Sequence, residues 1–180
     1  MPALDQPVSP LARLLSLEVA LCRRATRAQQ RAGWLRLFRA VSRLGDGVAW
    51  YALAALLPLC QGLAALPTVA RMTLVGVSAT LVAQGLKRAT ARPRPFLAHP
   101  GILAGARALD RYSFPSGHTL HAVAFSAVVI PDFPQLAWAL VPFTLLVAAS
   151  RGVLGLHYPT DVAAGALVGA LVAAAIPALL

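Results

Sequence analysis

The stretch VAWYALAALLPLCQGLAAL, residues Val48–Leu66, sets the fold class because it contains no Asp, Glu, Lys or Arg. A helix needs roughly 17–25 predominantly apolar residues to cross the hydrocarbon core of a bilayer. Of all 180 residues, 58% are hydrophobic and 12% are charged, whereas a soluble domain has roughly 45–50% apolar residues. The sequence therefore predicts a helical membrane protein.

Four further apolar runs follow this stretch. Met72–Leu86 and Val162–Leu180 also lack charged residues and are long enough, or nearly so, to span a bilayer. Thr119–Ile130 and Leu136–Ser150 are shorter and are separated by Pro131-Asp132-Phe133-Pro134, a sequence that disfavours a continuous helix. We predict a helical hairpin there; the alternative is a pair of buried helices of a soluble protein. The predicted fold is an all-α, multi-pass membrane helical bundle of about five spanning helices.

The segment before the first run is basic and amphipathic. Over Leu11–Leu44, apolar and basic residues recur at helical spacing on two separate faces. The apolar face carries Leu14, Leu17, Leu21, Trp34, Phe38 and Val41, and the basic face carries Arg24, Arg27, Arg31, Arg36, Arg39 and Arg43. This pattern is typical of an interfacial amphipathic helix, although a solvated basic helix would carry the same charged face. Gly45-Asp46-Gly47 then breaks the segment, so we predict a basic amphipathic part, residues 1–46, and a membrane-embedded domain, residues 47–180.

The net charge of +10 limits the classes of partner. It would suit nucleic acid in a soluble protein, but the basic residues lie outside the apolar runs and no nucleic-acid-binding motif accompanies them. Phosphates at a membrane surface explain the charge better, so we predict membrane lipids as partners and no nucleic acid. Cys22 and Cys60 form neither a disulfide framework nor a metal-ligand spacing. Arg13 and Glu18 interrupt the first apolar stretch, so we expect the first span to direct insertion without a cleaved signal peptide.

Three polar clusters lie at the ends of apolar runs, where polar residues are costly unless they face a wet site or a partner. In the first, KRATARPRPF, Lys87 follows the second span, and Arg92 and Arg94 each precede a proline that stiffens the backbone. Fixed guanidinium groups suit a phosphate. Taken alone, this cluster is equally typical of a basic loop that sets membrane topology.

The second cluster is FPSGH, in which Pro115 suits the first turn of a helix. Ser116 and Gly117 would then present a hydroxyl and backbone N–H groups to an anion, with His118 beside it. A nucleophilic Ser116 is the alternative, but the Gly-x-Ser-x-Gly elbow is missing.

The third cluster is SRGVLGLHYPTD, in which Arg151 ends an apolar run and His157 and Asp161 lie on either side of Pro159. An Asp161 carboxylate that accepts the Nδ1–H of His157 would leave Nε2 free as a nucleophile. The alternatives are an N-cap role for Asp161 and a metal site that combines it with the three histidines 118, 121 and 157. Only one carboxylate would balance such a metal among several cations.

Together the clusters supply cations for a phosphoryl group, helix N–H donors for its oxygens, one histidine to attack and one to protonate a leaving oxygen. In order and spacing they resemble the type 2 phosphatidic acid phosphatase (PAP2) superfamily, whose pattern is Lys-x6-Arg-Pro, Pro-Ser-Gly-His and Ser-Arg-x5-His-x3-Asp. Every motif position is matched between Lys87 and Asp161.

The resemblance implies a division of labour among these residues. His157 would attack phosphorus and form a phosphohistidine, Asp161 would orient it, and His118 would protonate the leaving group. The phosphate oxygens would be held by Lys87, Arg94, Ser116, the Gly117 amide and Arg151. The resemblance also implies that no metal or other cofactor is needed, and it assigns no catalytic role to Arg92 or His121.

The predicted function is therefore an integral-membrane phosphatase of a lipid phosphate or diphosphate, such as phosphatidate, phosphatidylglycerol phosphate or undecaprenyl diphosphate. A non-catalytic lipid-phosphate binder or transporter is the alternative, but it would have no need of intact His118, His157 and Asp161. The superfamily also includes soluble vanadium haloperoxidases, which the long apolar runs disfavour.

The charge distribution bears on membrane orientation. With five spans, 15 of the 16 Lys and Arg residues fall on the side of the three motifs, and only Arg71 lies near the other side. We expect a multi-pass protein of the cell membrane, most simply a bacterial inner membrane. The positive-inside rule would place the motifs in the cytoplasm, whereas bacterial lipid phosphatases of the family that it resembles usually face the periplasm, so both orientations stay open.

Overall fold

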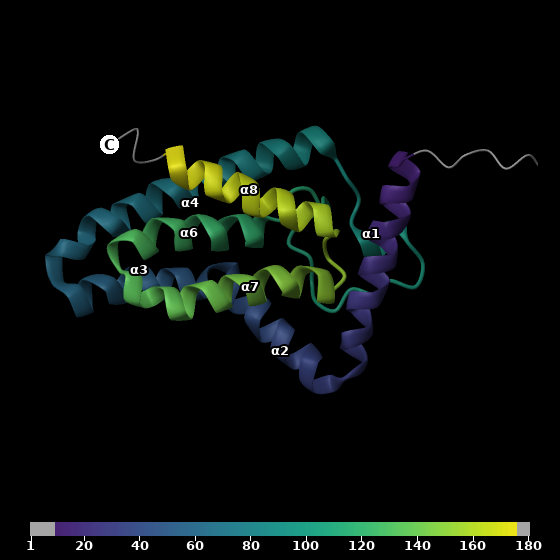
Figure 1. Cartoon of the computed structure of the whole chain (residues 1–180), viewed down its shortest axis with the longest axis horizontal. Helices are drawn as coiled ribbons and strands as arrows, with labels where there is room; N and C mark the ends of the chain where they lie inside the picture. The colour runs from purple at the N-terminus through teal and green to yellow at the C-terminus, as the bar shows by residue number, and fades with distance from the viewer. Residues whose placement is uncertain (1–9, 176–180) are drawn as a thin grey trace, which may run out of the picture.

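A computed structural model describes residues 10–175, and this part of the chain is helical and forms no β-strand. Its main body is a bundle of apolar helices that run roughly along the long axis of the molecule (Figure 1). The bundle helices are α3 (Ala49–Gln61), α4 (Leu66–Thr90), α6 (Gly117–Asp132), α7 (Ala137–Val153) and α8 (Pro159–Ala175). The helices before it are α1 (Pro10–Thr26), η1 (Arg27–Gln30), α2 (Ala32–Arg43) and the π-helical turn η2 (Leu44–Val48). The all-α prediction is confirmed.

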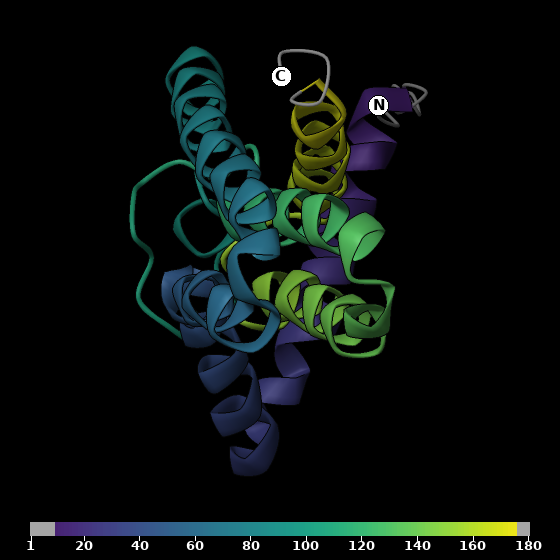
Figure 2. The ribbon, with the colours of Figure 1, turned by 90° about the vertical axis from the view of Figure 1, so that its left-hand side faces the viewer.

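Helix α6 is the centre of the bundle and packs against α4, α7 and α8 (Figure 2). Its approach to α8 is close because Gly165 and Gly169 lie against its backbone. A Cβ atom at Gly165 would come within 2.6 Å of the Ser116 carbonyl oxygen, and one at Gly169 would collide with the Leu120 carbonyl oxygen. This small-xxx-small contact brings the start of α6 to the start of α8.

The first two apolar runs are helical, but their boundaries differ from the prediction. Helix α3 ends at Gln61, and the chain reverses through Gly62 (φ +69°) and the short helix η3 (Gly62–Ala65) inside the predicted span. Helix α4 then continues past the predicted end at Leu86 to Thr90. Lys87 and Arg88 are tolerated there because cations are favourable in the last turn of a helix. The helix stops where Arg92, as a residue before proline, disfavours helical backbone.

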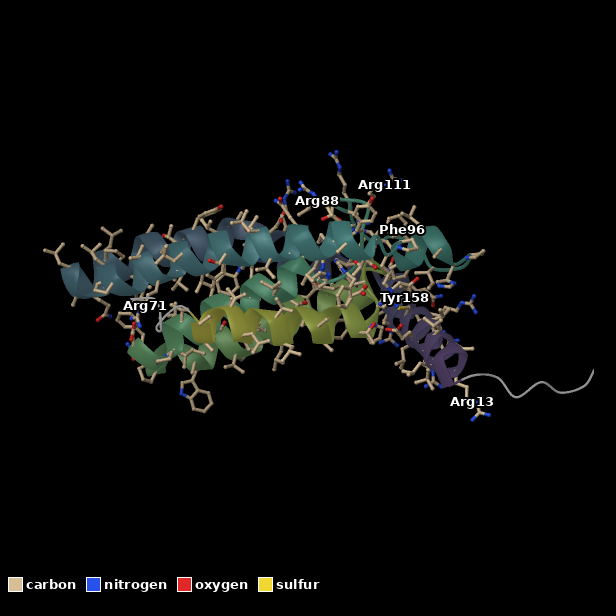
Figure 3. All side chains as sticks on the ribbon, turned by 90° about the horizontal axis from the view of Figure 1, so that it is seen from above. Arg13, Arg71, Arg88, Phe96, Arg111 and Tyr158 are labelled. Atoms are coloured by element: carbon tan, nitrogen blue, oxygen red, sulfur yellow. The ribbon has the colours of Figure 1, made fainter. Side chains whose placement is uncertain are left out.

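The predicted hairpin between the third and fourth runs is confirmed. Helix α6 continues over Pro131 to Asp132, and the short helix η4 (Pro134–Leu136) leads directly into α7. The Asp132 carboxylate accepts hydrogen bonds from Arg71 and Thr68 of α4. This polar cluster lies at one end of the bundle, and Arg88 and Arg111 lie toward the other end (Figure 3).

The N-terminal segment is two helices instead of the single amphipathic helix suggested by its pattern. Arg31 has extended backbone angles (φ −95°, ψ 112°), so α1 and α2 point in different directions. In α2 the stripe residues Phe38 and Val41 are buried against the bundle, at 7% and 6% exposure, whereas Trp34 is 46% exposed and Leu14 and Leu17 of α1 stay largely exposed. Helix α1 crosses the end of the bundle next to α7 and α8 (Figure 1). The domain division at residues 46 and 47 stays a prediction.

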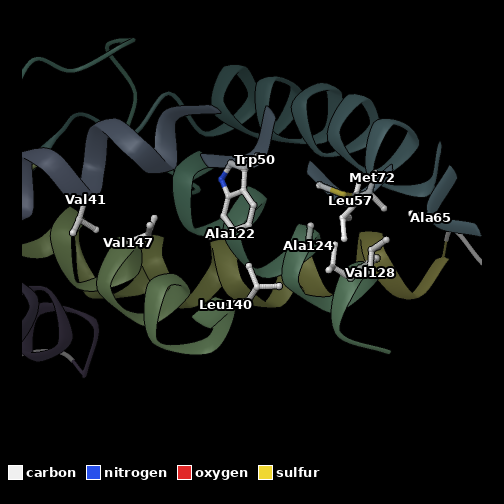
Figure 4. Packing of buried hydrophobic residues seen from close by; sticks show 13 residues of the cluster. Val41, Trp50, Leu57, Ala65, Met72, Ala122, Ala124, Val128, Leu140 and Val147 are labelled. Atoms are coloured by element: carbon white, nitrogen blue, oxygen red, sulfur yellow. The ribbon is translucent and has the colours of Figure 1, made fainter. Parts of the chain in front are cut away.

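The main hydrophobic core lies between α3, α4, α6 and α7 (Figure 4). Trp50 is its largest side chain, and its ring lies 5.2 Å from that of Phe125 and 5.5 Å from that of Phe143, centroid to centroid. Val75 and Val147 are fully buried around it. Many large apolar side chains instead point outward, among them Leu59 at 80% and Trp138 at 89% exposure, as expected of surfaces that face lipid.

Two helical stretches of the described residues are long and apolar enough to cross a membrane, one within Ala32–Thr90 and one over Pro134–Val153. Helix α8 is apolar but shorter. Residues 176–180 of the predicted span Val162–Leu180 lie outside the described residues. The number of five spans stays a prediction.

Candidate active site

A cavity of about 600 Å³ opens at the end of the bundle where the three sequence clusters meet. Six of the predicted site residues line it: Lys87, Arg94, Gly117, His118, Arg151 and His157. Away from these residues its wall is largely apolar and includes Trp50, Tyr51, Met72, Leu81 and Phe125. Cations and histidines thus occupy one part of a cavity that continues between hydrophobic side chains.

His157 lies in the loop between α7 and α8 and is 1% exposed. Its Nδ1 lies 2.6 Å from the carbonyl oxygen of Ser113, which can only accept, so Nδ1 carries the hydrogen. Nε2 is therefore unprotonated, and its lone pair accepts a hydrogen bond from Nη1 of Arg94 at 3.1 Å. Burial, and then the positive charges of Arg151, Arg94 and Lys87, lower the pKa of His157 well below its ordinary value. The ring is neutral at neutral pH, as a nitrogen nucleophile must be.

Asp161 stands near His157 but does not make the predicted hydrogen bond. Its Oδ2 lies 3.7 Å from Nδ1 and instead accepts from the backbone N–H of Tyr158 at 2.8 Å. Its Oδ1 accepts from Nη1 of Arg92 at 2.7 Å. The difference arises because Asp161 lies in the first turn of α8, where its carboxylate reaches back to the backbone N–H of Tyr158, the residue before the helix. The acceptor of the Nδ1–H is a backbone carbonyl from the loop before α6, which sequence spacing alone does not reveal.

Arg151 is a buried cation without a carboxylate partner. It is 2% exposed, its Nη1 donates to the Ser42 hydroxyl at 2.5 Å, and its Nε has no hydrogen-bond partner. No carboxylate of residues 10–175 lies within 4.0 Å of its guanidinium nitrogens. A buried charge in this state is costly unless an anion joins it.

Lys87 and Arg94 share Asp110. Nζ of Lys87 donates to Oδ2 at 2.7 Å, and Nη2 of Arg94 donates to Oδ1 at 3.0 Å. Burial by itself would raise the pKa of Asp110, but the hydrogen bond and charge of Lys87, together with Arg94, lower it overall. One carboxylate thus holds two cations at the cavity wall and leaves this side of the site with excess positive charge.

The start of α6 contributes the remaining predicted residues. Ser116 is fully buried and is the N-cap, since its Oγ accepts from the backbone N–H of Thr119 and lies 3.0 Å from the Thr119 hydroxyl. It does not line the cavity, so neither the predicted phosphate contact of its hydroxyl nor the alternative of a nucleophilic serine is supported by this geometry. Gly117 does line the cavity, where the first N–H groups of a helix lack intrahelical partners.

His118 and His121 lie one turn apart on α6 and both line the cavity. Nε2 of His118 lies 3.5 Å from Oδ1 of Asp46, which belongs to the Gly45-Asp46-Gly47 turn. His121 lies 2.8 Å from the Gly117 carbonyl oxygen and 3.1 Å from the Thr80 hydroxyl. Among residues 10–175, no three His, Cys, Asp or Glu side chains are close enough to hold a metal ion. That the chemistry needs no metal stays a prediction.

The sequence interpretation missed Asp46, Asp110, Ser113 and the side chain of Arg92. A signal was present for the two acids, because the chain has only six acidic residues and a carboxylate next to apolar runs needs a partner. Each of the five acids in residues 10–175 lies within ion-pair distance of an Arg, Lys or His. Ser113 carried no such signal, since it acts through its backbone.

The described residues thus form an all-helical bundle with a buried neutral histidine, a second histidine and a cation cluster at one end. This is the arrangement expected of a membrane phosphatase that acts through a histidine. The family model described as "PAP2 superfamily" matches residues 68–180, more than half of the chain. The chain therefore belongs to the PAP2 superfamily, and the predicted resemblance is confirmed.

Two relatives carry names that describe phosphatases. The decaprenylphosphoryl-5-phosphoribose phosphatase of Mycolicibacterium smegmatis is 38% identical over 168 residues, which cover 89% of this chain and 83% of the relative. The undecaprenyl-diphosphatase BcrC of Bacillus subtilis is 44% identical over 80 residues, but the match covers only 44% of this chain and 40% of the relative.

Two solved structures share the fold. The crystal structure of Aquifex aeolicus LpxE is similar with a TM-score of 0.78 and 23% identity, over 90% of this chain and 95% of that one. A transmembrane PAP2 type phosphatidylglycerolphosphate phosphatase from Bacillus subtilis gives a TM-score of 0.74 and 20% identity, over 93% and 86% of the two chains. The predicted membrane helical bundle is thus confirmed as a fold.

Proposed function

We propose that this chain is an integral-membrane phosphatase that hydrolyses a lipid phosphate or diphosphate through a phosphohistidine at His157. The observation that carries the proposal is the state of His157: its Nδ1–H is held by the Ser113 carbonyl, which leaves Nε2 unprotonated and facing the cation cluster, where it accepts from Arg94. Arg151, buried with an unpartnered Nε, supports an anion beside it.

In the first step, Nε2 of His157 forms a bond to phosphorus while the bond from phosphorus to the leaving oxygen breaks. Lys87, Arg94, Arg151 and the Gly117 amide stabilise the charge that develops on the phosphoryl oxygens. His118 gives a proton to the leaving oxygen, and the Asp46 carboxylate, 3.5 Å from its Nε2, is placed to stabilise the ring whenever it is protonated. The leaving group is a lipid alcohol for a monoester and a lipid monophosphate for a diphosphate.

In the second step, a water oxygen attacks phosphorus and the bond from phosphorus to Nε2 breaks. The now neutral His118 takes a proton from this water, as the reverse of its first role requires. The electron pair returns to His157 and inorganic phosphate leaves. Asp161, 3.7 Å from Nδ1, stabilises the positive charge on His157 while the phosphoenzyme exists.

A lipid substrate is supported by the shape and lining of the cavity. Its charged part adjoins a larger wall of apolar side chains, so a phosphate can lie at His157 while an attached hydrocarbon chain lies against Trp50 and Phe125. Two relatives are named for polyprenyl-linked phosphates, decaprenylphosphoryl-5-phosphoribose and undecaprenyl diphosphate. Polyprenyl phosphates are therefore the first substrates to test.

Five spans in a bacterial cell membrane suit the helices of the bundle, with the site at the headgroup layer of one leaflet. A labelling experiment determines which side of the membrane this leaflet faces. A single cysteine introduced at Gly101, in a variant without Cys22 and Cys60, is labelled by a membrane-impermeant reagent in intact cells only if the site faces outward.

The enzymatic proposal is tested with detergent-solubilised protein and a panel of lipid phosphates and diphosphates ranked by kcat/KM. We expect phosphate release by the wild type, an acid-labile phosphoenzyme after rapid quenching, and loss of both in His157→Ala. His118→Ala should slow release without removing the nucleophile. Unchanged turnover in both variants contradicts the mechanism, and binding without turnover by the wild type favours a lipid-phosphate binder.

A further inference from the structure

Helix α1 contributes a buried carboxylate next to the candidate active site. Glu18 is 7% exposed, although it lies on an otherwise exposed part of α1. Its Oε2 accepts from Nη2 of Arg92 at 2.7 Å, and its Oε1 accepts from the backbone N–H of Thr160 at 3.1 Å and from the Thr160 hydroxyl. The family model matches residues 68–180, so Glu18 lies outside the matched residues.

Arg92 connects this carboxylate to Asp161. Its Nη1 donates to Oδ1 of Asp161 at 2.7 Å and to the Thr160 hydroxyl at 2.8 Å. Its guanidinium also lies 4.0 Å from the centroid of the Tyr158 ring. The planar group is therefore held on two edges and one face, which favours one orientation over the many that a free arginine samples.

Arg92 also acts through its backbone. Its carbonyl oxygen accepts from the backbone N–H of Ser113 at 2.8 Å, and the carbonyl oxygen of Ser113 is the acceptor for Nδ1 of His157. Of the two oxygens that face the Nδ1 side of His157, the Asp161 carboxylate accepts from the Arg92 side chain, and the Ser113 carbonyl belongs to the residue whose N–H donates to the Arg92 carbonyl. Displacement of Arg92 would move both.

We propose that Glu18 is a positioning residue that holds Arg92, and through it Asp161 and Ser113, in the arrangement that orients His157 for attack. The inference rests on the proposed phosphatase function and extends it by making the N-terminal helix part of the site. Fully buried Asp161 needs a cationic partner to stay ionised, and Arg92 shared with Glu18 supplies it at a defined place. Cys22, one turn after Glu18, packs its thiol 3.8 Å from the His157 carbonyl oxygen, so α1 meets the nucleophile loop as well.

The test compares Glu18→Gln with a matched control, Gln29→Ala. Glu18→Gln keeps the size and an acceptor for Thr160 but loses the charge that holds Arg92. Gln29 also attaches the N-terminal segment, through hydrogen bonds to the carbonyl oxygens of Leu103 and Val153, without touching Asp161 or Arg92. We expect Glu18→Gln to lower kcat roughly 10- to 100-fold with little change in KM, as loss of outer partners does at other histidine sites. Gln29→Ala should keep kcat within about twofold, and Glu18→Asp should recover part of the loss.

A double-mutant cycle locates the effect. In an Asp161→Asn background, the further effect of Glu18→Gln should fall below about threefold, because both substitutions break one chain of contacts. Equal losses in Glu18→Gln and Gln29→Ala, an unchanged kcat in Glu18→Gln, or a full effect in the Asp161→Asn background would each overturn the proposal.

A spectroscopic measurement separates this proposal from the enzymatic one. In ¹⁵N side-chain spectra of histidine-labelled protein, the Nδ1 signal of His157 should shift in Glu18→Gln and stay in place in Gln29→Ala. That result supports the positioning role even if no lipid in the panel is hydrolysed. A lack of hydrolysis would contradict the phosphatase function but not the positioning role. An unmoved Nδ1 signal in Glu18→Gln contradicts the positioning role whatever the activity.

Discussion

Arg71 and Arg151 lie near opposite ends of the same bundle, and their surroundings differ in one respect. Both have a buried Nε without a hydrogen-bond partner. Arg71 nevertheless forms an ion pair with Asp132, supported by the Thr68 hydroxyl, so the charge at that end is balanced. Among residues 10–175, Arg151 has the neutral Ser42 hydroxyl as its hydrogen-bond partner and no carboxylate within 4.0 Å. An arginine whose charge is balanced by a carboxylate joins two helices, whereas a buried arginine without a counter-charge needs an added anion.

The largest expected effect is at the nucleophile beside Arg151. His157→Ala should lower kcat by roughly 10³-fold or more, because the proposed nucleophile is lost, and the other imidazoles that line the cavity, His118 and His121, lie on α6 and make other contacts. Release of phosphate from a polyprenyl phosphate in detergent is the measurement, and thermal unfolding of the same sample is the control for folding. Retained turnover would break the assignment of this end as the catalytic one.

The direct test of the comparison substitutes the two arginines in the same way. Arg151→Gln should lower kcat/KM about 10²- to 10³-fold, since a fixed cation that faces the developing phosphoryl charge is lost. Arg71→Gln should leave kcat/KM within about twofold, because its partner is Asp132 and not the substrate. Similar losses in both variants would show that the difference in ion pairing has no functional meaning.

The pH response of His157 sharpens the comparison further. Burial and the charges of Arg151, Arg94 and Lys87 lower its pKa, so the neutral, nucleophilic ring persists below the ordinary imidazole pKa of about 6.5. Histidine ¹⁵N spectra from about pH 4 to about pH 8 should show this titration displaced to low pH. Arg151→Gln should move it upward, because a neighbouring positive charge is removed, and Arg71→Gln should not. A titration near 6.5 in the wild type would contradict the assigned electrostatics.

The smallest expected effect is on stability at the balanced end. Arg71 and Asp132 are both partly exposed, with side-chain exposures of 26% and 29%, so water screens their attraction. Arg71→Gln should lower the free energy of unfolding by about 1 kcal/mol or less. Asp132→Asn, which keeps an acceptor for Thr68, is the matched variant, and denaturant titration in detergent measures both. A loss of several kcal/mol would mean that this ion pair is a main support of the hairpin.

Much of the site was predictable because the three motifs are short and their spacing is local. Lys87, Arg94, Gly117, His118, Arg151 and His157 all line one cavity, as their resemblance to the PAP2 pattern implied. The prediction that Asp161 accepts the Nδ1–H of His157 was wrong. The acceptor is Ser113, which lies 44 residues before His157 and contributes only a backbone carbonyl. Glu18 was unpredictable for the same reason, since its contacts with Thr160 join residues 142 positions apart.

The N-terminal segment shows a second limit of the sequence pattern. The stripes over residues 11–44 indicated helix correctly, but the same stripes suit one straight helix or two. The extended backbone at Arg31 lets α2 bury Phe38 while α1 crosses the end of the bundle. Whether the segment forms one helix or two depends on the surface that α7 and α8 offer, and not on the periodicity of the sequence.

By itself the sequence determined the helical membrane fold, the hairpin at Pro131–Pro134 and the motif residues, because hydropathy, proline geometry and short spacings act over neighbouring residues. Only the tertiary structure decided which carbonyl orients His157, which arginine stays without a counter-charge, and how α1 reaches Asp161 through Arg92. Those features depend on side chains brought together by helix packing, and the close contact of Gly165 and Gly169 with α6 brings the two histidine clusters together.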